Sequence, residues 1–304
     1  MAKTIRIGTR DSELALWQAN TVQNKLTDLG HKTELVPVKS TGDIVLDKPL
    51  YELGITGIFT KTLDIAMLNG DIDIAVHSMK DVPTALPKGI VEAAVLERAN
   101  VEDILVHKEL DFLENEGTIA TGSLRRQAQW LHKYPNHKVV DLRGNVNTRM
   151  QKLMDNSDWN GAIFAAAGLE RIHLKPENYI NLDWMIPAPA QGAMLVVAKE
   201  EDEYCRKALS QLNHETSEIC VHIEREFLRE LEGGCTAPIG ALAIIKHGSI
   251  HFKGALLSLD GKHKIEVKKD IKLEERMGFG KKCAQEILNN GGAELMKEIK
   301  AMMK

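Results

Sequence analysis

The stretch that decides the fold class is IRIGTRDSELALWQANTVQNKLTDLGHKTELVPV, residues 5–38. It begins with a short apolar strand pattern at residues 5–8 and ends with another at residues 35–38. Between them, apolar residues keep the spacing of one helix face: Ala15, Ala19, Val22, Leu26 and Leu29. Strand, helix and strand in this order predict a mostly parallel sheet that is covered by helices.

The same alternation continues along the chain. Residues 59–68 have a helix pattern that Asn69 and Gly70 end, and residues 73–76 have the pattern of the next strand. The intervening connection, residues 42–57, is long for a compact unit of this kind and contains several glycines. It is either a lid over a site or a variable surface insertion, and the sequence leaves both open.

The alternation then starts again and later changes. From residue 98, strand patterns alternate with helix patterns, whereas after residue 215 a helix leads into antiparallel strands that turns interrupt. A strand at residues 193–198 could belong to either of the first two units. A chain that crosses twice between two α/β lobes makes a hinged cleft. We expect α/β domain 1 at residues 1–97 and 193–213, α/β domain 2 at residues 98–192, and a smaller α+β domain 3 at residues 214–304.

The composition is that of an ordinary globular protein: among 304 residues, 43% are hydrophobic and 27% are charged. The strongest apolar runs are far shorter than the roughly 20 residues of a membrane span, and the chain starts without a signal-peptide pattern. We therefore expect a cytoplasmic protein that does not enter a membrane. The net charge of -4 argues against a general nucleic-acid surface, because such surfaces carry a basic excess.

The four cysteines are widely spaced, without a C-x-x-C pair or a Cys/His cluster, so we expect neither a disulfide framework nor a metal site. Cys205, Cys220 and Cys283 lie in helix patterns and are interpreted as buried side chains. Cys235 differs, because the segment EGGCTAPIG, residues 232–240, surrounds it with glycine and proline and offers no apolar face. A reactive or modified thiol is the better interpretation there.

Arginines follow predicted strands at three places. Ser123 is a natural N-cap, and Arg125 and Arg126 come directly after it. This helix start either binds an anion or is an ordinary capped helix with solvated arginines. Arg143 and Arg10 also end strands, where the ligands of open α/β sheets bind. Together the three positions predict one sheet edge that binds a carboxylate-rich small molecule.

A candidate acid/base group ends another strand. The segment DIAVHSMKDVP, residues 73–83, closes with a turn that contains Lys80 and Asp81. A plain surface ion pair is the commoner explanation of two such neighbours. At the same edge as the arginines, however, the Asp81 carboxylate is placed for acid/base work or for stabilising a substrate cation. We interpret His77 as a packing residue.

Seven segments resemble, in order, the signature segments of the hydroxymethylbilane synthase (porphobilinogen deaminase) family, over residues 6–240. They are TRDSELALWQA, HSMKDVP, GSLRRQ, LRGNVNTR, AAAGLERI, PAPAQGA and GGCTAPIGA. The resemblance implies two lobes similar to those of periplasmic anion-binding proteins, and a third domain that carries Cys235. It implies a monomeric transferase that condenses four porphobilinogen molecules, with loss of ammonia, into the linear tetrapyrrole hydroxymethylbilane.

The resemblance also implies a cofactor and residue roles. A dipyrromethane, made by the enzyme from its own substrate, is attached to Cys235 through a thioether, and Asp81 is the catalytic carboxylate. Each pyrrole unit carries acetate and propionate, so a growing chain is a polycarboxylate that needs many cations. The implied cofactor-binding residues are Lys80, Ser78, Thr121, Ser123, Arg125, Arg126, Arg143 and Arg149. The implied substrate-binding residues are Arg10, Ser12, Lys61, Arg171 and Gln191.

The chain departs from the family's pattern at three places. Thr56 stands where a lysine is usual, Thr62 where an acid is usual, and residues 99–102 replace a more charged stretch. Two other functions fit part of the pattern. One is a non-enzymatic module that binds an organic anion, which needs no Cys235 segment. The other is a cysteine hydrolase or acyltransferase, which needs a contact between Cys235 and His77.

Overall fold

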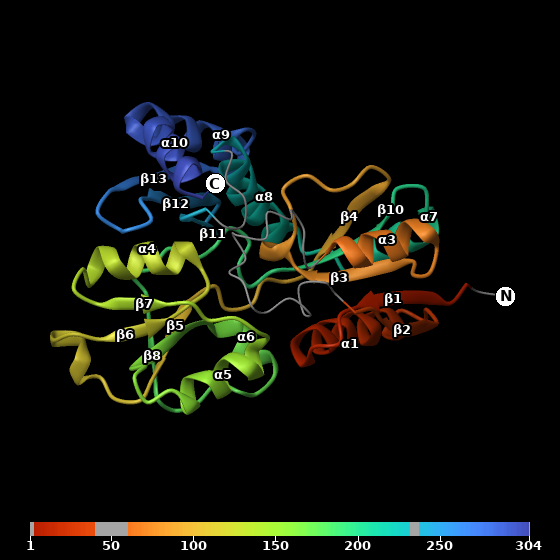
Figure 1. Ribbon diagram of the computed structural model, residues 1–304. Helices are drawn as coiled ribbons and strands as arrows, with labels where there is room; N and C mark the ends of the chain where they lie inside the picture. Colours follow the sequence, from red (N-terminus) through yellow and green to blue (C-terminus); the bar gives the residue numbers. More distant parts are fainter. Residues whose placement is uncertain (1–2, 40–59, 232–236, 304) are drawn as a thin grey trace. The chain divides into compact units, whose positions relative to one another are not determined.

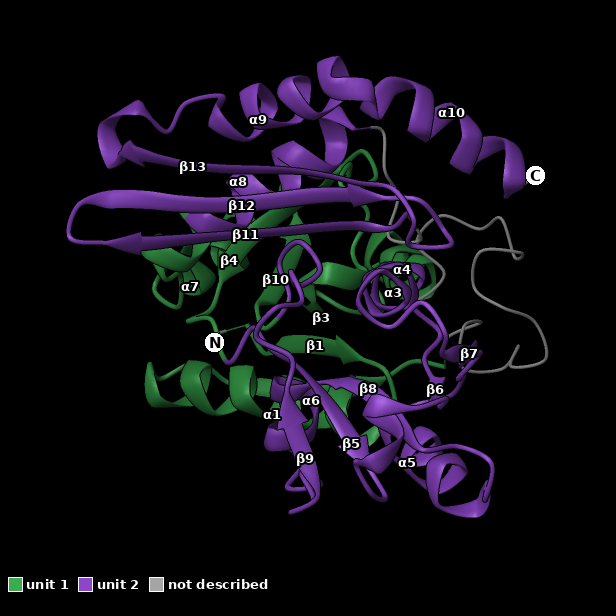
Figure 2. Ribbon diagram, turned by 90° about the vertical axis from the view of Figure 1, so that its left-hand side faces the viewer, with its two compact units in different colours: residues 1–46, 55–99, 192–219 green, residues 47–54, 100–191, 220–304 purple. Residues whose placement is uncertain are grey.

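The computed structural model describes residues 3–39, 60–231 and 237–303 (Figure 1). The chain divides into two compact units, which Figure 2 shows in different colours. Unit 1 takes its described residues from the ranges 1–46, 55–99 and 192–219, and unit 2 from the ranges 47–54, 100–191 and 220–304. The predicted boundaries of three domains stay a prediction.

Unit 1 is built on a five-stranded sheet with the strand order β2-β1-β3-β10-β4. Its strands are β1 (Ile5–Thr9), β2 (Thr33–Pro37), β3 (Ile74–Ser78), β4 (Ile90–Val95) and β10 (Met194–Lys199). Its helices are α1 (Glu13–Asp28), α3 (Lys61–Asn69) and α7 (Glu203–Ser210), with a 3-10 turn at Met79–Asp81. β1 is parallel to β2 and β3, whereas β10 is antiparallel to β3 and β4. The strand that the sequence could assign to either unit therefore belongs to unit 1.

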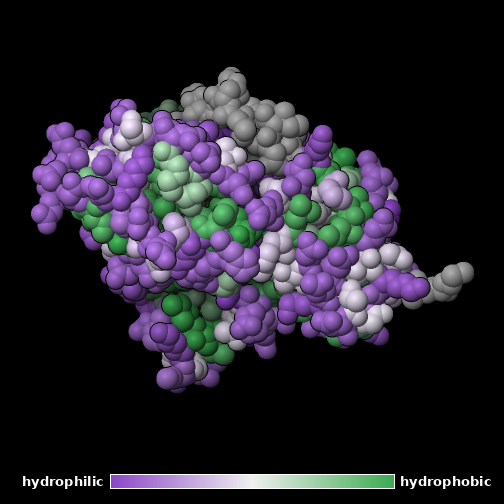
Figure 3. Space-filling view, turned by 90° about the horizontal axis from the view of Figure 1, so that it is seen from below, coloured by the Kyte–Doolittle hydropathy of each residue, from purple (hydrophilic) through white to green (hydrophobic). Residues whose placement is uncertain are grey.

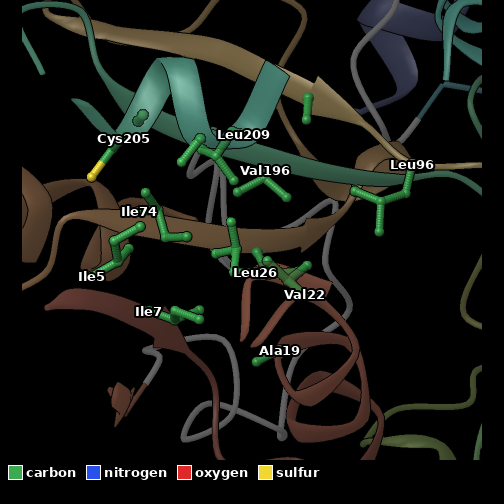
Figure 4. Close-up of a cluster of buried hydrophobic side chains, with 14 of the residues drawn as sticks. Ile5, Ile7, Ala19, Val22, Leu26, Ile74, Leu96, Val196, Cys205 and Leu209 are labelled. Carbon is green, nitrogen blue, oxygen red and sulfur yellow. The ribbon is translucent and has the colours of Figure 1, made fainter. Parts of the chain in front are cut away.

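The predicted face of α1 forms part of the core of unit 1 (Figure 4). Ala19, Val22 and Leu26 are fully buried in one cluster with side chains of β1, β3 and β10. Burial of a side chain of the size of Val22 or Leu26 contributes roughly 1.5–3 kcal/mol to stability. Leu29 was expected on the same face, but it is 43% exposed because the helix ends at Asp28.

Unit 2 begins with a second five-stranded sheet, of order β7-β6-β8-β5-β9. Its strands are β5 (Asp103–His107), β6 (Thr118–Ala120), β7 (Lys138–Val140), β8 (Gly161–Ala165) and β9 (Tyr179–Asn181). Its helices are α4 (Leu124–Lys133), α5 (Val146–Asp155) and α6 (Ala166–Arg171), with a 3-10 turn at Asp111–Glu114. β6 is parallel to β7 and β8, and β5 is antiparallel to β8 and β9. The two sheets thus follow one plan. The first three strands in each order are parallel, the fourth is antiparallel to the third, and the fifth is antiparallel to the fourth.

The rest of unit 2 is a three-stranded antiparallel sheet with helices. α8 (Glu215–Glu230) begins in unit 1 and continues into unit 2. It precedes β11 (Ile239–Lys246), β12 (Ser249–Leu257) and β13 (Lys264–Lys272), and α9 (Phe279–Ile287) and α10 (Ala293–Met302) follow. His247 and Gly248 both have positive φ, as a two-residue hairpin turn requires. At the next turn a Cβ on Gly261 would lie 2.5 Å from the carbonyl oxygen of Ala128, so this turn of the small sheet fits against α4. The expected fold class, two α/β lobes and a smaller α+β part, is confirmed.

Three of the four cysteines lie in the described part of the chain, and all three are buried in helices as expected. Burial raises the pKa of the Cys205 thiol to about 12 and that of the Cys283 thiol to about 11. These two thiols are therefore poor nucleophiles. Cys235 lies outside the described residues.

No helix in the described part of the chain is long and apolar enough to cross a membrane. On the face drawn in Figure 3, hydrophilic residues predominate and hydrophobic residues form separate small patches.

Candidate active site

The carboxyl ends of β1 and β3 bring part of the predicted site together in unit 1. The two strands are parallel neighbours, so Arg10, which follows β1, and Ser78, which ends β3, lie at the same sheet edge. A pocket at this edge is lined by Arg10 and Ser78 together with Ser12 and Asp81. Four predicted residues from two separate segments of the chain therefore share one pocket.

Short local structures position these side chains. Ser12 is the N-cap of α1, where its hydroxyl accepts a hydrogen bond of 3.4 Å from the backbone N–H of Ala15. Asp81 ends the 3-10 turn after β3, and the backbone N–H of Val82 closes this turn by donating to the Met79 carbonyl at 3.1 Å. Asp81 is half-buried, so its carboxylate keeps access to the pocket.

Gln18 is a pocket residue that the sequence reasoning missed. It is buried on the apolar face of α1, and its Nε2 donates to the hydroxyl oxygen of Ser78 at 2.9 Å. Because that oxygen accepts from Gln18, the hydroxyl proton of Ser78 is directed to another partner. A polar residue among the buried positions Ala15, Ala19 and Val22 was the signal in the sequence.

His77 also lines the pocket, and its side chain is buried as expected. Its Nε2 has no hydrogen-bond partner among the described residues. Burial, and then the charge of Arg10, lower the pKa of the imidazole to about 4. A neutral and weakly basic imidazole is a poor activator of a thiol, which disfavours the cysteine hydrolase as a function.

Two predicted lysines do not line this pocket. Lys61 is exposed as the first residue of α3. Lys80 is half-buried in the turn directly before Asp81. The structure thus leaves their roles as predictions.

The second group of predicted residues lies at the carboxyl ends of β6 and β7 in unit 2. Thr121 follows β6, and its hydroxyl accepts a hydrogen bond of 3.2 Å from the backbone N–H of Ser123. Ser123 in turn caps α4 by accepting from the backbone N–H of Arg126. A Cβ on Gly122 would lie 2.7 Å from the Leu142 carbonyl oxygen, so the two strand ends approach closely because this residue is glycine.

The segment after β7 is held by its own hydrogen bonds. Asn145 caps α5, and its side-chain oxygen accepts from the backbone N–H of Thr148 at 2.9 Å. Gly144 has a φ of +115°, which favours glycine, and its carbonyl accepts from Nε of Arg149 at 2.7 Å. The positions of Arg143 and Arg149 are therefore fixed by the backbone between them.

Arg143 and Arg171 are cations in a desolvated setting. Burial lowers the pKa of Arg143, which is 4% exposed, although Asp141 acts in the opposite direction. Burial also lowers the pKa of Arg171, at the end of α6, to about 10, and Glu170 opposes this. Burial disfavours the charged form of both groups, and a nearby anion favours it.

Arg125 and Arg126 at the start of α4 are not solvated. The interpretation of this segment as an ordinary capped helix with solvated arginines is therefore wrong. They are only 4% and 6% exposed, and both donate to the carboxylate of Asp103 in β5. Burial alone raises the pKa of this carboxyl, but the charges of Arg125 and Arg126 hold it well below its usual range. The Nε2 of Gln191 donates to the same carboxylate at 3.0 Å.

The prediction that three strand ends deliver arginine to one sheet edge is wrong. Arg10 follows a strand of the sheet in unit 1, whereas Arg125 and Arg143 follow strands of the sheet in unit 2. Cys235, Thr56 and the long connection at residues 42–57 lie outside the described residues. The described site residues therefore form two groups, each at the edge of its own sheet.

Comparisons with known proteins agree with the resemblance seen in the sequence. A family model described as porphobilinogen deaminase, dipyromethane cofactor binding domain, matches residues 5–207, and one described as porphobilinogen deaminase, C-terminal domain, matches residues 218–289. A porphobilinogen deaminase of Syntrophomonas wolfei is 41% identical over 98% of this chain and 99% of its own. A probable porphobilinogen deaminase of Methanocaldococcus jannaschii is 43% identical over 94% of this chain and 100% of its own.

The solved structures that the chain matches share little sequence with it. The methionine-binding protein MetQ is 16% identical, with a TM-score of 0.42 over 69% of this chain and 89% of its own. The periplasmic VFT2 domain of Bordetella pertussis BvgS is 12% identical, with a TM-score of 0.43 over 69% of this chain and 86% of its own. The sequence comparisons, which cover nearly the full length, show that the chain belongs to the porphobilinogen deaminase family.

Proposed function

We propose that the protein is a hydroxymethylbilane synthase, a transferase that condenses four porphobilinogen molecules into the linear tetrapyrrole hydroxymethylbilane. Each condensation forms a carbon–carbon bond between the aminomethyl carbon of one unit and a pyrrole α-carbon of the next. Ammonia leaves the first carbon and a proton leaves the second, and water releases the finished chain. The observation that carries this proposal is the pocket that joins Arg10, Ser12, Ser78 and Asp81 in a chain of this family.

Asp81 is the catalytic residue in this proposal. Its carboxylate accepts a hydrogen bond from a pyrrole N–H, stabilises the positive charge that develops as ammonia leaves, and passes protons during each condensation. Arg10 and Ser12 bind the carboxylates of the incoming porphobilinogen. The Ser78 hydroxyl, whose oxygen accepts from Gln18, has its proton available to donate to a carboxylate.

A dipyrromethane group attached to Cys235 would supply the pyrrole α-carbon at which the chain starts. The donor set of unit 2 fits such a polycarboxylate. Thr121 and Ser123 offer hydroxyls at the end of β6, and the desolvated guanidinium groups of Arg143 and Arg171 favour an anion. The remaining predicted residues bind carboxylates in two groups. Those of the cofactor are bound by Lys80, Arg125, Arg126 and Arg149, and those of the substrate by Lys61 and Gln191.

We also propose the cell compartment and the assembly. Buried thiols at Cys205, Cys220 and Cys283 suit a reducing cytoplasm. The protein acts as a monomer of three domains, with boundaries as predicted from the sequence. Light scattering of the purified protein tests the monomer, because a dimer would double the measured mass.

Intact mass spectrometry tests the cofactor and its attachment. We expect the wild-type protein to carry the added mass of two linked pyrrole units and to colour with an acidic aldehyde reagent for pyrroles. Cys235→Ser should lack both signals. Cys205→Ala is the matched control, because its thiol is buried in α7, and it should keep them.

Turnover of porphobilinogen is measured with the same samples. The wild-type protein should release ammonia and a linear tetrapyrrole, and Cys235→Ser should not. A wild-type protein that stays unmodified and inactive after incubation with porphobilinogen would exclude the transferase. It would leave the anion-binding module as the function.

A further inference from the structure

The carboxylate of Asp103 organises three of the residues that the sequence assigned to ligand binding. Asp103 begins β5 and is fully buried. Its Oδ2 accepts from Nη1 of Arg125 at 2.7 Å, and its Oδ1 accepts from Nε of Arg126 at 2.9 Å. Oδ1 also accepts from Nε2 of Gln191 at 3.0 Å. One carboxylate thus joins the start of α4 to the segment before β10.

Further hydrogen bonds hold the guanidinium groups of the two arginines. Nη1 of Arg125 also donates to the Ile186 carbonyl at 2.8 Å, and Nη1 of Arg126 donates to the Ile163 carbonyl at 2.9 Å. Long side chains lose substantial rotamer entropy when they are held in one geometry. Because the Asp103 network holds these side chains in the protein itself, a ligand does not have to order them.

The network holds two guanidinium groups in a buried setting. The carboxylate of Asp103 lies 2.7 Å from Nη1 of Arg125 and 2.8 Å from Nη2 of Arg126. Nε of Arg125 is buried without a hydrogen-bond acceptor among the described residues. A buried donor without an acceptor is costly, and a ligand carboxylate that accepts from it lowers this cost. The unused donor of Arg125 therefore favours an anionic ligand.

We propose that Asp103 is a positioning residue of the anion site in unit 2. It orients Arg125, Arg126 and Gln191 toward the carboxylates of the pyrrole chain and does not itself contact that chain. This inference rests on the proposed function. Asp103 acts through the arginines, so its loss reduces binding more than it reduces the chemical step at Asp81.

Asp73 offers a matched control for a buried carboxylate with a structural role. It is also nearly fully buried, and its carboxylate accepts from Nε and Nη2 of Arg6, both at 3.0 Å. Lys3 approaches it at 3.1 Å. Asp73 directly precedes β3, whereas Ser78 ends this strand and Asp81 lies beyond that opposite end. Its ion pairs thus resemble those of Asp103 without touching a predicted ligand-binding residue.

The test compares full-length Asp103→Asn, Asp103→Glu and Asp73→Asn with the wild-type protein. For each protein we measure the cofactor fraction by intact mass, kcat and KM for porphobilinogen, and Tm. Asp103→Asn should raise KM by roughly 10- to 100-fold, with a smaller change in kcat per cofactor-bearing molecule. Asp103→Glu keeps the negative charge but moves it, so its KM should lie between the values of the wild-type protein and Asp103→Asn. Asp73→Asn should lower Tm and leave KM near the wild-type value.

The outcomes separate the inference from the proposed function. If the wild-type protein turns over porphobilinogen and Asp103→Asn lowers Tm without raising KM, Asp103 is structural and the inference is wrong. If Asp103→Asn does not fold, Asp103→Glu decides, and a wild-type KM in that variant overturns the inference. A wild-type protein without cofactor and turnover overturns both proposals.

Discussion

The two sheet edges have the same topology but opposite chemical character. At the edge in unit 1, one arginine, hydroxyl groups and the half-buried carboxylate of Asp81 share a pocket. At the edge in unit 2, arginines predominate, and the carboxylate of Asp103 is buried among them. In the proposed function, one strand plan, used twice, has proton transfer at one edge and most of the anion-binding arginines at the other. The following variants test this division, beginning with the largest expected effect.

Asp81→Asn should have the largest effect on turnover. Replacing the carboxylate by an amide removes the negative charge and the proton acceptor, so kcat should fall by roughly 10²- to 10⁴-fold. Tm should stay unchanged because the side chain is half-buried in a turn. Asp71→Asn, at an exposed carboxylate of the same unit, is the control and should keep full kcat. Normal turnover in Asp81→Asn would place the chemistry elsewhere.

Arg143→Gln should weaken binding more than it slows the chemical step. Loss of a charge-assisted hydrogen bond costs about 1.5–3 kcal/mol, which corresponds to a rise in KM of roughly 10- to 150-fold. The control is Lys138→Gln, at an exposed cation on β7, which should leave KM unchanged. A fall in kcat at constant KM would contradict the division between the two edges.

Gly144→Ala should destabilise the segment that holds Arg143 and Arg149. Gly144 has a φ of +115°, and an added Cβ would lie 2.8 Å from Cβ of Thr148, so we expect a loss of about 1–3 kcal/mol. Gly30→Ala separates backbone strain from the contact with Thr148. Gly30 also has a positive φ, of +85°, but nothing lies within 4 Å of its added Cβ. Chemical denaturation measures both losses. Equal losses would mean that the contact with Thr148 contributes nothing.

Asp73→Asn should have the smallest effect, a loss of folding stability that depends on pH. Burial raises the pKa of Asp73, but hydrogen bonds from Arg6 and Lys3 outweigh it and lower the value to about 2. The unfolded value is about 3.9, so the ion pairs stabilise the fold above that pH, and this contribution is lost as the pH falls toward 2. We expect about 1–2 kcal/mol at neutral pH, because the partner side chains are partly exposed.

Denaturation of the wild-type protein and Asp73→Asn between pH 7 and pH 2 measures this difference. Protonation of His77, whose pKa is about 4, occurs in both proteins and cancels in the comparison. A difference in stability that stays constant over the whole pH range would contradict the assigned ion pairs.

Local patterns predicted most of the fold. The spacing of Ala15, Ala19, Val22 and Leu26 predicted both α1 and its buried face, because these residues depend on one helix period. The partner of the strand at residues 193–198 was not predictable, since pairing of β10 with β3 and β4 joins segments about 100 residues apart. Periodicity describes neighbours in sequence and does not describe strand pairing.

The candidate site was predicted in part for the same reason. Motifs that follow strands identified Arg10, Asp81 and Arg143, because strand ends are visible in the sequence. Asp103 was missed, since an acid before an apolar strand carries no sign of the two arginines that it contacts across the sheet. Its role depends on which helix start packs above β5, and a single sequence does not encode that as a local pattern.

The late position of β10 has a consequence for synthesis on the ribosome. Among the described strands of unit 1, β4 pairs only with β10, and this partner emerges with residues 194–199. All five strands of the next sheet, β5 to β9, have left the ribosome by then, since they end at Asn181. Local strand pairings form before distant ones. Residues 100–191, which interrupt unit 1 in the sequence, therefore contain the sheet that can be completed first. The nascent chain can thus finish the sheet whose edge precedes Arg125 and Arg143 before the sheet that positions Asp81.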